Sequence, residues 1–439
     1  MSIFIFRRDF RIKDNTAWNK MVKENVSIYP IFIFTPEQID NNSYKSNNAV
    51  QFMIESLLEL KKTINLTLCY GDIEDVLKDI INKNTITSIY TNTDYTPYSI
   101  KREKLLTKIC KLYNIKFNYY HDITLFEPKT ILNKTGSVYQ KFTPFYIECM
   151  KQKNNIRSIY SVNIITTKHV SISTKYKADK KLDTFYTYND KINIHGGRIN
   201  ALKTLSSVPN HYEKTRNFLH INTTNLSAYL KFGCISIREA YHKLNKYGML
   251  IRQLIWREFY YHIGHGYIER FGKSLKGGKY DMIKWENNMT LFKKWKKGLT
   301  GFPIVDACMT QLNTTGYMHN RGRLIVASFL VKNLRIDWKY GEKYFATKLI
   351  DYDVYVNQGN WQWVAGTGAD SMPYFRIFNP SLQSAKYDKE AIYIKKWLPQ
   401  LKDIIPKHLH DWEKYHTNIY IKPIINYNDS KKKTLAMYR

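Results

Sequence analysis

The segment RQLIWREFYYHI, residues 252–263, combines residue types that rarely share one helix face. Gln253, Trp256, Arg257 and Tyr260 fall at i, i+3, i+4 and i+7, so a helix would place an amide, an indole, a cation and a phenol on one side. Aromatic rings stack on unpaired bases for about 1–3 kcal/mol each, and a neighbouring amide can hydrogen-bond a base edge. This face is suited to base recognition; a Trp256 that simply packs in the core is the alternative.

A second polar group follows in TGYMHNRGRLIVASFLVKNL, residues 315–334. Asn320 and Leu324 lie one helical turn apart. Arg323 sits on a half-apolar helix and needs an acidic partner if it is buried. Asp351 and Asp353 in the segment LIDYDVYVNQGNWQW are the expected carboxylates. This density of polar groups indicates a bound polar ligand, or alternatively a hydrogen-bonded structural turn.

Four tryptophans lie within the same part of the chain: Trp285, Trp338, Trp361 and Trp363. Individually, each is typical of a core residue. Together they could pass electrons between a buried redox cofactor and the surface, but separation along the sequence does not give separation in space.

The elements that must position these residues change character along the chain. Residues 1–150 alternate short β-rich runs (SIFIF, SIYPIFIF, LTLCY) with amphipathic stretches, which predicts βαβ units in a doubly wound parallel sheet. No GxGxxG follows the first run, so ordinary dinucleotide binding is not indicated. Residues 151–195 lack periodicity and are expected to be an interdomain linker over the surface. From 196 to 439 the apolar spacing approaches 3.6, which predicts an all-α domain.

Charge gives the first indication of a partner. Lys and Arg number 68 against 37 Asp and Glu, a formal net charge of +31, which favours a nucleic-acid partner. An A/T-rich coding sequence would explain many lysines but not the acidic deficit. The five cysteines have no paired spacing, which argues against disulfides and a metal cluster. The N-terminal apolar run is too short for a signal peptide or a membrane span, so we expect a soluble, intracellular protein without membrane contact.

Several of these segments resemble the cryptochrome/photolyase family over almost the full chain. FRRDFRIKDN, NTDYTPY and GSVYQKFTPF resemble motifs of its α/β domain, and GGRINAL resembles the start of its helical domain. The strongest similarity spans 250–380, through WREFYYH, TGFPIVDACMTQLNTTGYMHNRGRLIVASFLVKNLRIDW, GNWQW and PYFRIFNPSLQ. Within the family, the sequence is most similar to the class I cyclobutane pyrimidine dimer (CPD) photolyases.

The resemblance implies an FAD folded into a U inside the helical domain. Asp351 and Asp353 match the residues around the flavin pyrimidine edge and ribose, with Arg323 paired to Asp351, and Asn357 matches the residue that faces flavin N5. Hydroxyls and backbone N–H groups at a helix start suit phosphates. The implied phosphate contacts are Tyr212, Thr223, Thr224, Asn225, Leu226, Ser227 and Arg257.

The resemblance also implies how the reaction proceeds. Trp361, Trp338 and Trp285 match, in that order outward from the flavin, the family's photoreduction chain. The reduced flavin absorbs light and passes one electron to the dimer, the cyclobutane ring opens, and the electron returns, so the cofactor carries the difficult step.

On the substrate side, Trp256 and Trp363 match the rings that hold a flipped pyrimidine dimer in UV-damaged DNA. Extruding the lesion costs a few kcal/mol, and less when it already stacks badly. The positions lining its pocket are Gln253, Asn320 and Leu324, and the expected phosphate contacts of the rim are Arg321 and Lys386.

One position departs from the CPD pattern and leaves alternatives open. Gln253 stands where those enzymes usually carry Glu, and glutamine is common there in (6-4) photolyases and animal-type cryptochromes. The (6-4) enzymes place two histidines where this chain has Asn320 and Leu324, and neither residue can transfer protons, so CPD repair is favoured. A blue-light receptor is a further alternative, which Asn357 and the short stretch after FRIFNPSLQ disfavour.

Two features are not decided by the sequence. The α/β domain is expected to hold a second, antenna chromophore, which can be a folate, a deazaflavin or a flavin. A monomer is expected because that is the family's usual state.

Overall fold

The computed structural model describes residues 1–24, 27–162, 168–169, 172–209 and 211–438. Packing divides the chain into two compact units. Unit 1 comprises residues 1–189, 194–207 and 225–268, and unit 2 comprises residues 190–193, 208–224 and 269–439. Residues 163–167 and 170–171 of the predicted linker lie outside the described residues.

A parallel β-sheet forms the centre of unit 1, with the strand order β3-β2-β1-β4-β5 and β6 paired to β2. The predicted α/β class is therefore confirmed. Runs such as SIFI and SIYPIFIF are apolar without alternation because both faces of the sheet are covered, and Ile3, Ile31 and Ile89 have no exposed surface. The strands are β1 Ser2–Ile5, β2 Ser27–Phe34, β3 Thr67–Tyr70, β4 Ser88–Asn92, β5 Lys116–Tyr120 and β6 Lys168–His169.

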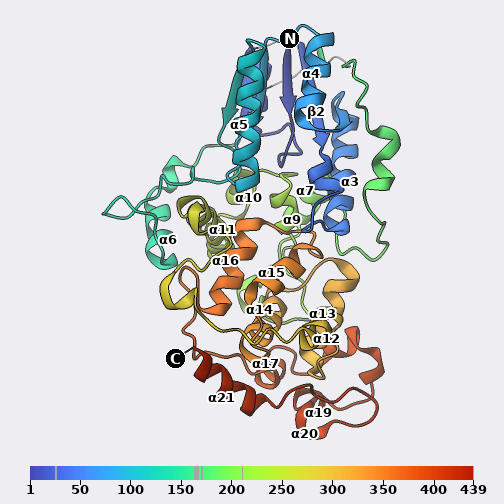
Figure 1. The fold of residues 1–439 in the computed structure, drawn as a ribbon, viewed down its shortest axis with the longest axis vertical. Helices are drawn as coiled ribbons and strands as arrows, with labels where there is room; N and C mark the ends of the chain where they lie inside the picture. Colours follow the sequence, from blue (N-terminus) through green and yellow to red (C-terminus); the bar gives the residue numbers. More distant parts are fainter. Residues whose placement is uncertain (25–26, 163–167, 170–171, 210, 439) are drawn as a thin grey trace. The chain divides into compact units, whose positions relative to one another are not determined.

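Helices follow the strands, and Figure 1 shows α3, α4 and α5 running alongside the sheet. Side-chain caps fix several starts: Ser46 accepts from Ala49 N before α3, and Thr96 accepts from Ser99 N before α5. The helices of unit 1 are α1 Thr16–Glu24, α2 Pro36–Ile39, α3 Asn47–Thr63, α4 Ile73–Lys83, α5 Pro97–Leu112, α6 Phe142–Lys151, α7 Arg198–Ser206, α9 Ser227–Lys231, α10 Ile237–Leu244 and α11 Gly248–Gly266.

The limits of unit 1 differ from the predicted division at residue 195. Its packing continues through the described part of the predicted linker, where Ile172 and Phe185 are buried. It also takes in α7 and α9–α11, which the sequence assigned to the helical domain. One physical reason is apolar: Phe232, just after α9, stacks on Phe10 with ring centroids 5.9 Å apart.

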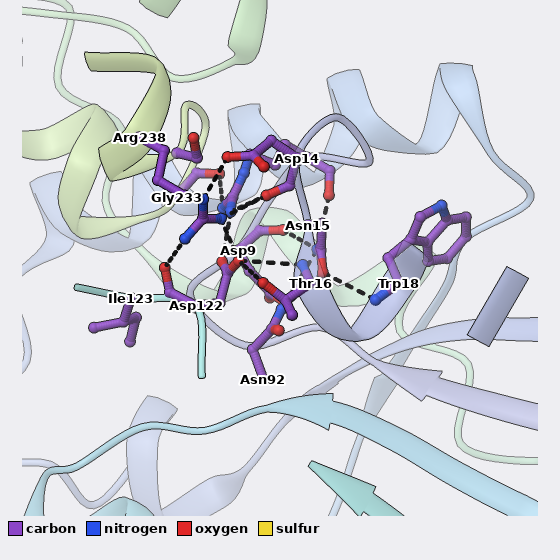
Figure 2. Close-up of polar contacts among 12 residues, drawn as sticks. Asp9, Asp14, Asn15, Thr16, Trp18, Asn92, Asp122, Ile123, Gly233 and Arg238 are labelled. Atoms are coloured by element: carbon purple, nitrogen blue, oxygen red, sulfur yellow. Dashed lines mark hydrogen bonds and ion pairs between the residues drawn. The ribbon is translucent and has the colours of Figure 1, made fainter. Parts of the chain in front are cut away.

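A buried ionic cluster is the second reason. Arg238 on α10 donates through Nε to Asp14 Oδ2 at 2.7 Å and through Nη2 to Asp122 Oδ1 at 2.6 Å (Figure 2). Arg11 Nη2 donates to the other oxygen of Asp122 at 2.5 Å. All four side chains are at most 4% exposed, so the charges are balanced by one another and not by water.

Polar side chains also fill the place where doubly wound sheets bind ligands, the crevice at the carboxyl ends of the central strands. Asn92, which ends β4, donates to Asp9 Oδ2 at 2.5 Å and to Asn15 Oδ1 at 2.8 Å (Figure 2). Burial raises the pKa of Asp9, although hydrogen bonds from Arg7 N and Asn92 oppose that rise. Protein groups occupy this end of the β1–β4 pair, in keeping with the missing GxGxxG.

Unit 2 is helical in its described residues, as predicted. Its core contains Trp295, Leu330, Trp361 and Trp412, and α14 continues into a π-helical turn at Phe329–Asn333. Its helices are α8 Tyr212–Thr215, α12 Met289–Lys297, α13 Pro303–Thr315, α14 Asn320–Ser328, α15 Trp338–Ala346, α16 Val354–Ala365, α17 Pro380–Tyr387, α18 Ile392–Trp397, α19 Pro406–His410, α20 Trp412–Tyr415 and α21 Tyr427–Met437. Nowhere in the described chain does a helix have the length and apolarity needed to cross a membrane.

Candidate functional site

The Arg323–Asp351 pair is the charged centre of the site in unit 2. Arg323 on α14 donates through Nη2 to both oxygens of Asp351, at 3.1 and 2.9 Å, and through Nε to Met318 O at 2.9 Å. Burial would lower the pKa of Arg323, but the Asp351 carboxylate outweighs it and raises that pKa. The structure therefore brings together the two side chains that were expected to pair.

Asn357 on α16 is held by a residue that the sequence did not single out. Its Nδ2 donates to the backbone O of Glu342 at 3.1 Å and to Glu342 Oε1 at 2.9 Å. Because both amide hydrogens point toward α15, the Oδ1 acceptor is the end of the amide that remains for a ligand. An amide can both donate and accept, and the geometry here favours the accepting role for Asn357.

Asp353 is the N-cap of α16, where its side chain accepts from Val356 N at 3.3 Å. This contact fixes the start of the helix that carries Asn357 and Trp361, and Asp353 is 7% exposed. Asp353 thus caps α16, and its place beside the ribose stays a prediction.

The expected phosphate-binding residues are divided between the two units. In unit 2, Tyr212 begins α8, burial raises its pKa, and Thr223 Oγ1 lies 3.3 Å from Tyr317 Oη. Thr224 is half-buried. In unit 1, Asn225 has φ +50°, a left-handed conformation that asparagine tolerates. It is followed by the start of α9, with buried Leu226 and exposed Ser227.

Arg257 lies on α11 in unit 1. Its Nη1 donates to Ile123 O at 2.9 Å, its guanidinium lies 4.8 Å from the Tyr261 ring centroid, and its side chain is 13% exposed. These contacts orient the guanidinium while leaving donors that a phosphate could use.

The three tryptophans of the expected electron path lie in or against the core of unit 2. Trp361 and Trp338 are 3% and 4% exposed, and Trp285 is partly buried against the same core. Two hydrogen bonds join the segments beside Trp285 and Trp338, from Glu286 N to Arg335 O at 3.0 Å and from Asp337 N to Asn287 Oδ1 at 2.9 Å. Trp285 is thus the most exposed of the three, and the order of electron transfer stays a prediction.

Trp256 is fixed by an aromatic stack in unit 1. Its ring lies parallel to that of Phe142 on α6, with centroids 3.7 Å apart and an interplanar angle of 2°. Phe259 meets it edge-on at 5.6 Å. Gln253, one turn earlier, directs its Nε2 toward Met249 O at 3.4 Å. Trp256 is half-buried, so the ring packs and also presents surface, and its role in base recognition stays a prediction.

Arg321 and Lys386, the expected rim cations in unit 2, meet on one ring. The Arg321 guanidinium lies 4.2 Å from the centroid of Tyr387 and Lys386 Nζ lies 5.5 Å from it. Arg321 also donates to Asn217 Oδ1 at 2.7 Å. Asn320, next to Arg321, is exposed, and Leu324 and Trp363 are partly buried against the core of unit 2.

Comparison with known proteins decides the family. Residues 2–161 match the family model for DNA photolyase, and residues 249–439 match the model for the FAD binding domain of DNA photolyase. A deoxyribodipyrimidine photo-lyase from Buchnera aphidicola subsp. Baizongia pistaciae is 36% identical, covering 100% of this chain and 98% of that relative. The chain belongs to the photolyase/cryptochrome family.

Solved structures of the photolyase/cryptochrome family agree. An archaeal photolyase from Sulfolobus tokodaii, described with two FAD molecules, superposes with a TM-score of 0.91 at 39% identity, covering 100% of this chain and 99% of that one. A cryptochrome from Synechocystis superposes with a TM-score of 0.91 at 27% identity, with the same coverage.

The side chains of unit 2 fit the FAD that this photolyase/cryptochrome membership implies. A flavin pyrimidine edge offers an N–H donor between carbonyl acceptors, and the Arg323–Asp351 pair supplies both kinds of partner. Glu342 accepts from the Asn357 Nδ2 and so orients the amide with its Oδ1 available as an acceptor. The described residues contain no group of three side chains that could hold a metal ion.

Sequence reasoning missed three residues that contact or neighbour the expected site residues, Glu342 in unit 2 and Phe142 and Arg252 in unit 1. Glu342 and Phe142 contact site residues that are distant along the chain, so no spacing rule could find them. Arg252 could have been found, because it lies four residues before Trp256 on one helix.

Proposed function

We propose that this chain is a light-dependent DNA photolyase that splits cyclobutane pyrimidine dimers. The observation that carries this proposal is full-length similarity to deoxyribodipyrimidine photo-lyases, combined with the oriented Asn357–Glu342 and Arg323–Asp351 pairs. When bound, reduced FAD would supply the photoexcited electron that opens the cyclobutane ring.

The chain's own residues would hold the cofactor and the lesion. Arg323 and Asp351 bind the polar edge of the ring system, and the oriented Oδ1 of Asn357 accepts a hydrogen bond from the N–H that a reduced flavin carries at N5. The expected phosphate contacts anchor the remainder of the cofactor. Trp361, Trp338 and Trp285 would carry electrons from a reductant in solution toward the bound cofactor.

The substrate-facing residues favour CPD over (6-4) products. Asn320 and Leu324 cannot relay a proton, whereas the amide of Gln253 can donate to a thymine carbonyl and accept from its N3–H. We propose Trp256 as the ring of unit 1 that stacks on the extruded dimer, and Trp363 as a contact of unit 2.

A defined-lesion assay tests this function. The purified, reduced protein is incubated with oligonucleotides that carry one CPD or one (6-4) product, in blue light and in darkness. Light-dependent restoration of the CPD alone is the expected result. Failure on both lesions despite bound, reduced FAD would favour a photoreceptor, the alternative that the Synechocystis relative represents.

Replacing Gln253 with glutamate is expected to raise the affinity for CPD-containing DNA about fivefold relative to undamaged DNA. A hydrogen bond to a charged acceptor is worth about 1 kcal/mol more than one to a neutral acceptor. Anisotropy titrations at one salt concentration measure both affinities. Gln253→Leu is the matched control and should lower the discrimination; equal discrimination in all three proteins would contradict this role.

We also propose an antenna chromophore in addition to the catalytic FAD, because the Sulfolobus relative is described with a second FAD as a light-harvesting cofactor. The absorption spectrum of chromophores released by denaturation distinguishes a folate, a deazaflavin and a flavin.

We further propose that the protein is an intracellular monomer, and light scattering of the purified protein tests its oligomeric state.

A further inference from the structure

Arg252 on α11 makes cation–π contacts with two aromatic rings of α6. Its guanidinium carbon lies 4.8 Å from the centroid of Phe142 and 4.9 Å from that of Tyr146. Helices α6 and α11 pack against each other within unit 1 (Figure 1), and both rings belong to α6. Cation–π contact of this kind restrains a guanidinium without consuming its N–H donors.

The guanidinium of Arg252 has no acidic partner. Among the described residues, no carboxylate lies within 4.0 Å of it and no group accepts a hydrogen bond from it. Every other arginine of unit 1 has such a contact: Arg102 donates to Ser99 Oγ, and the rest have a carboxylate within 4.0 Å. Arg252 therefore keeps five donors in a planar fork, which is the geometry that binds a phosphate.

The same rings hold Trp256. Arg252 and Trp256 are i and i+4 on α11, and Phe142 contacts both, 4.8 Å from the cation and 3.7 Å from the indole centroid. A cation and a half-exposed stacking ring thus share one rigid support. This is the combination that tracks a nucleic-acid backbone while a base stacks beside it.

We infer that Arg252 binds a backbone phosphate of the damaged DNA next to the base that stacks on Trp256, and that Phe142 and Tyr146 position it. The inference rests on the proposed function for the identity of the lesion. The chain's net charge of +31 favours a polyanion over an acidic protein partner for this open guanidinium.

The salt dependence of binding in darkness tests the inference. Arg252→Gln is expected to weaken binding of CPD-containing and undamaged duplexes about tenfold, and by the same factor for both, because a phosphate contact carries no sequence information. The slope of log K against log salt should become shallower by about 0.9, the value for one lost phosphate contact. Arg252→Lys should keep the slope.

Three further variants, at two positions, separate binding from folding. Lys181→Gln removes a different cation that lies over a tyrosine, 5.0 Å from the Tyr70 centroid, and should leave the slope unchanged. Phe142→Leu should weaken binding, and Phe142→Tyr should restore it. The inference would be overturned if the salt slope of Arg252→Gln equalled that of the wild type. It would also be overturned if Lys181→Gln made the slope shallower by the same amount as Arg252→Gln. Because undamaged DNA is titrated in darkness, this result is independent of whether the protein repairs either lesion.

Discussion

Replacing Arg238 with methionine is expected to lower the free energy of unfolding by about 3–5 kcal/mol, because it leaves Asp14 and Asp122 buried without their shared counter-charge. Arg11 would remain beside Asp122, and only the largely exposed Arg157 would remain near Asp14. The methionine side chain fills part of the volume of the arginine side chain. The loss of stability therefore measures the missing charge and not an empty cavity. Urea-induced unfolding followed by circular dichroism measures the change.

A neighbouring arginine provides the control. Arg157 lies 3.8 Å from the same Asp14, but its side chain is 45% exposed. Arg157→Met should therefore cost less than about 1 kcal/mol, as solvent-exposed pairs do. Equal losses in the Arg157 and Arg238 variants would show that burial does not determine the energy of this cluster.

The pH dependence of stability is a second property in which Arg238→Met should differ from the wild type. Burial by itself would raise the pKa of Asp122, but Arg11 and Arg238 outweigh it and hold the pKa well below its ordinary value. A depressed carboxyl pKa contributes stability that is fully present above the unfolded-state pKa of about 3.9 and is lost as pH falls toward the folded value. The wild type should therefore lose stability below about pH 4, and Arg238→Met should lose less over the same range.

Replacing Asp351 with asparagine is expected to reduce FAD affinity at least about 30-fold. The change removes the counter-charge of Arg323 and leaves a partly buried guanidinium unbalanced beside the flavin edge; such truncations cost about 2–5 kcal/mol. The purified variant should contain little FAD, which the ratio of flavin to protein absorbance measures directly.

Asp281→Asn is the matched control for Asp351. It breaks another arginine–aspartate pair of unit 2, that of Arg270 and Asp281, whose side chains are 27% and 37% exposed. Its FAD content should equal that of the wild type. A full FAD complement in Asp351→Asn would contradict the assigned role of the Arg323–Asp351 pair.

The sequence predicted the elements better than it predicted the contacts between them. Apolar runs and 3.6-residue spacing indicated the sheet and the helices, because those patterns record local burial. The Arg323–Asp351 pair followed from one requirement, that a buried cation needs a carboxylate. No comparable requirement pointed to Glu342 as the partner of Asn357, since an amide can be satisfied by many groups.

The predicted division at residue 195 had the same limitation. Composition changes there, but the packing of Phe232 and Arg238 against the sheet domain depends on which side chains meet in three dimensions. Likewise, the motif containing Phe142 could be recognised without revealing that its ring covers Trp256. Periodicity reports which face of an element is buried, but it does not identify the neighbour.

The ionic cluster also bears on how the protein is made. Asp14 and Arg238 are 224 residues apart, so a ribosome adding about 5–20 residues per second leaves Asp14 without this partner for about 10–45 s. During that time the nascent sheet carries an incompletely balanced carboxylate at its carboxyl edge. Unit 1 can therefore reach its final state only after α10 has emerged, and slower translation through residues 190–238 would lengthen the period in which the growing chain is exposed to chaperones and proteases.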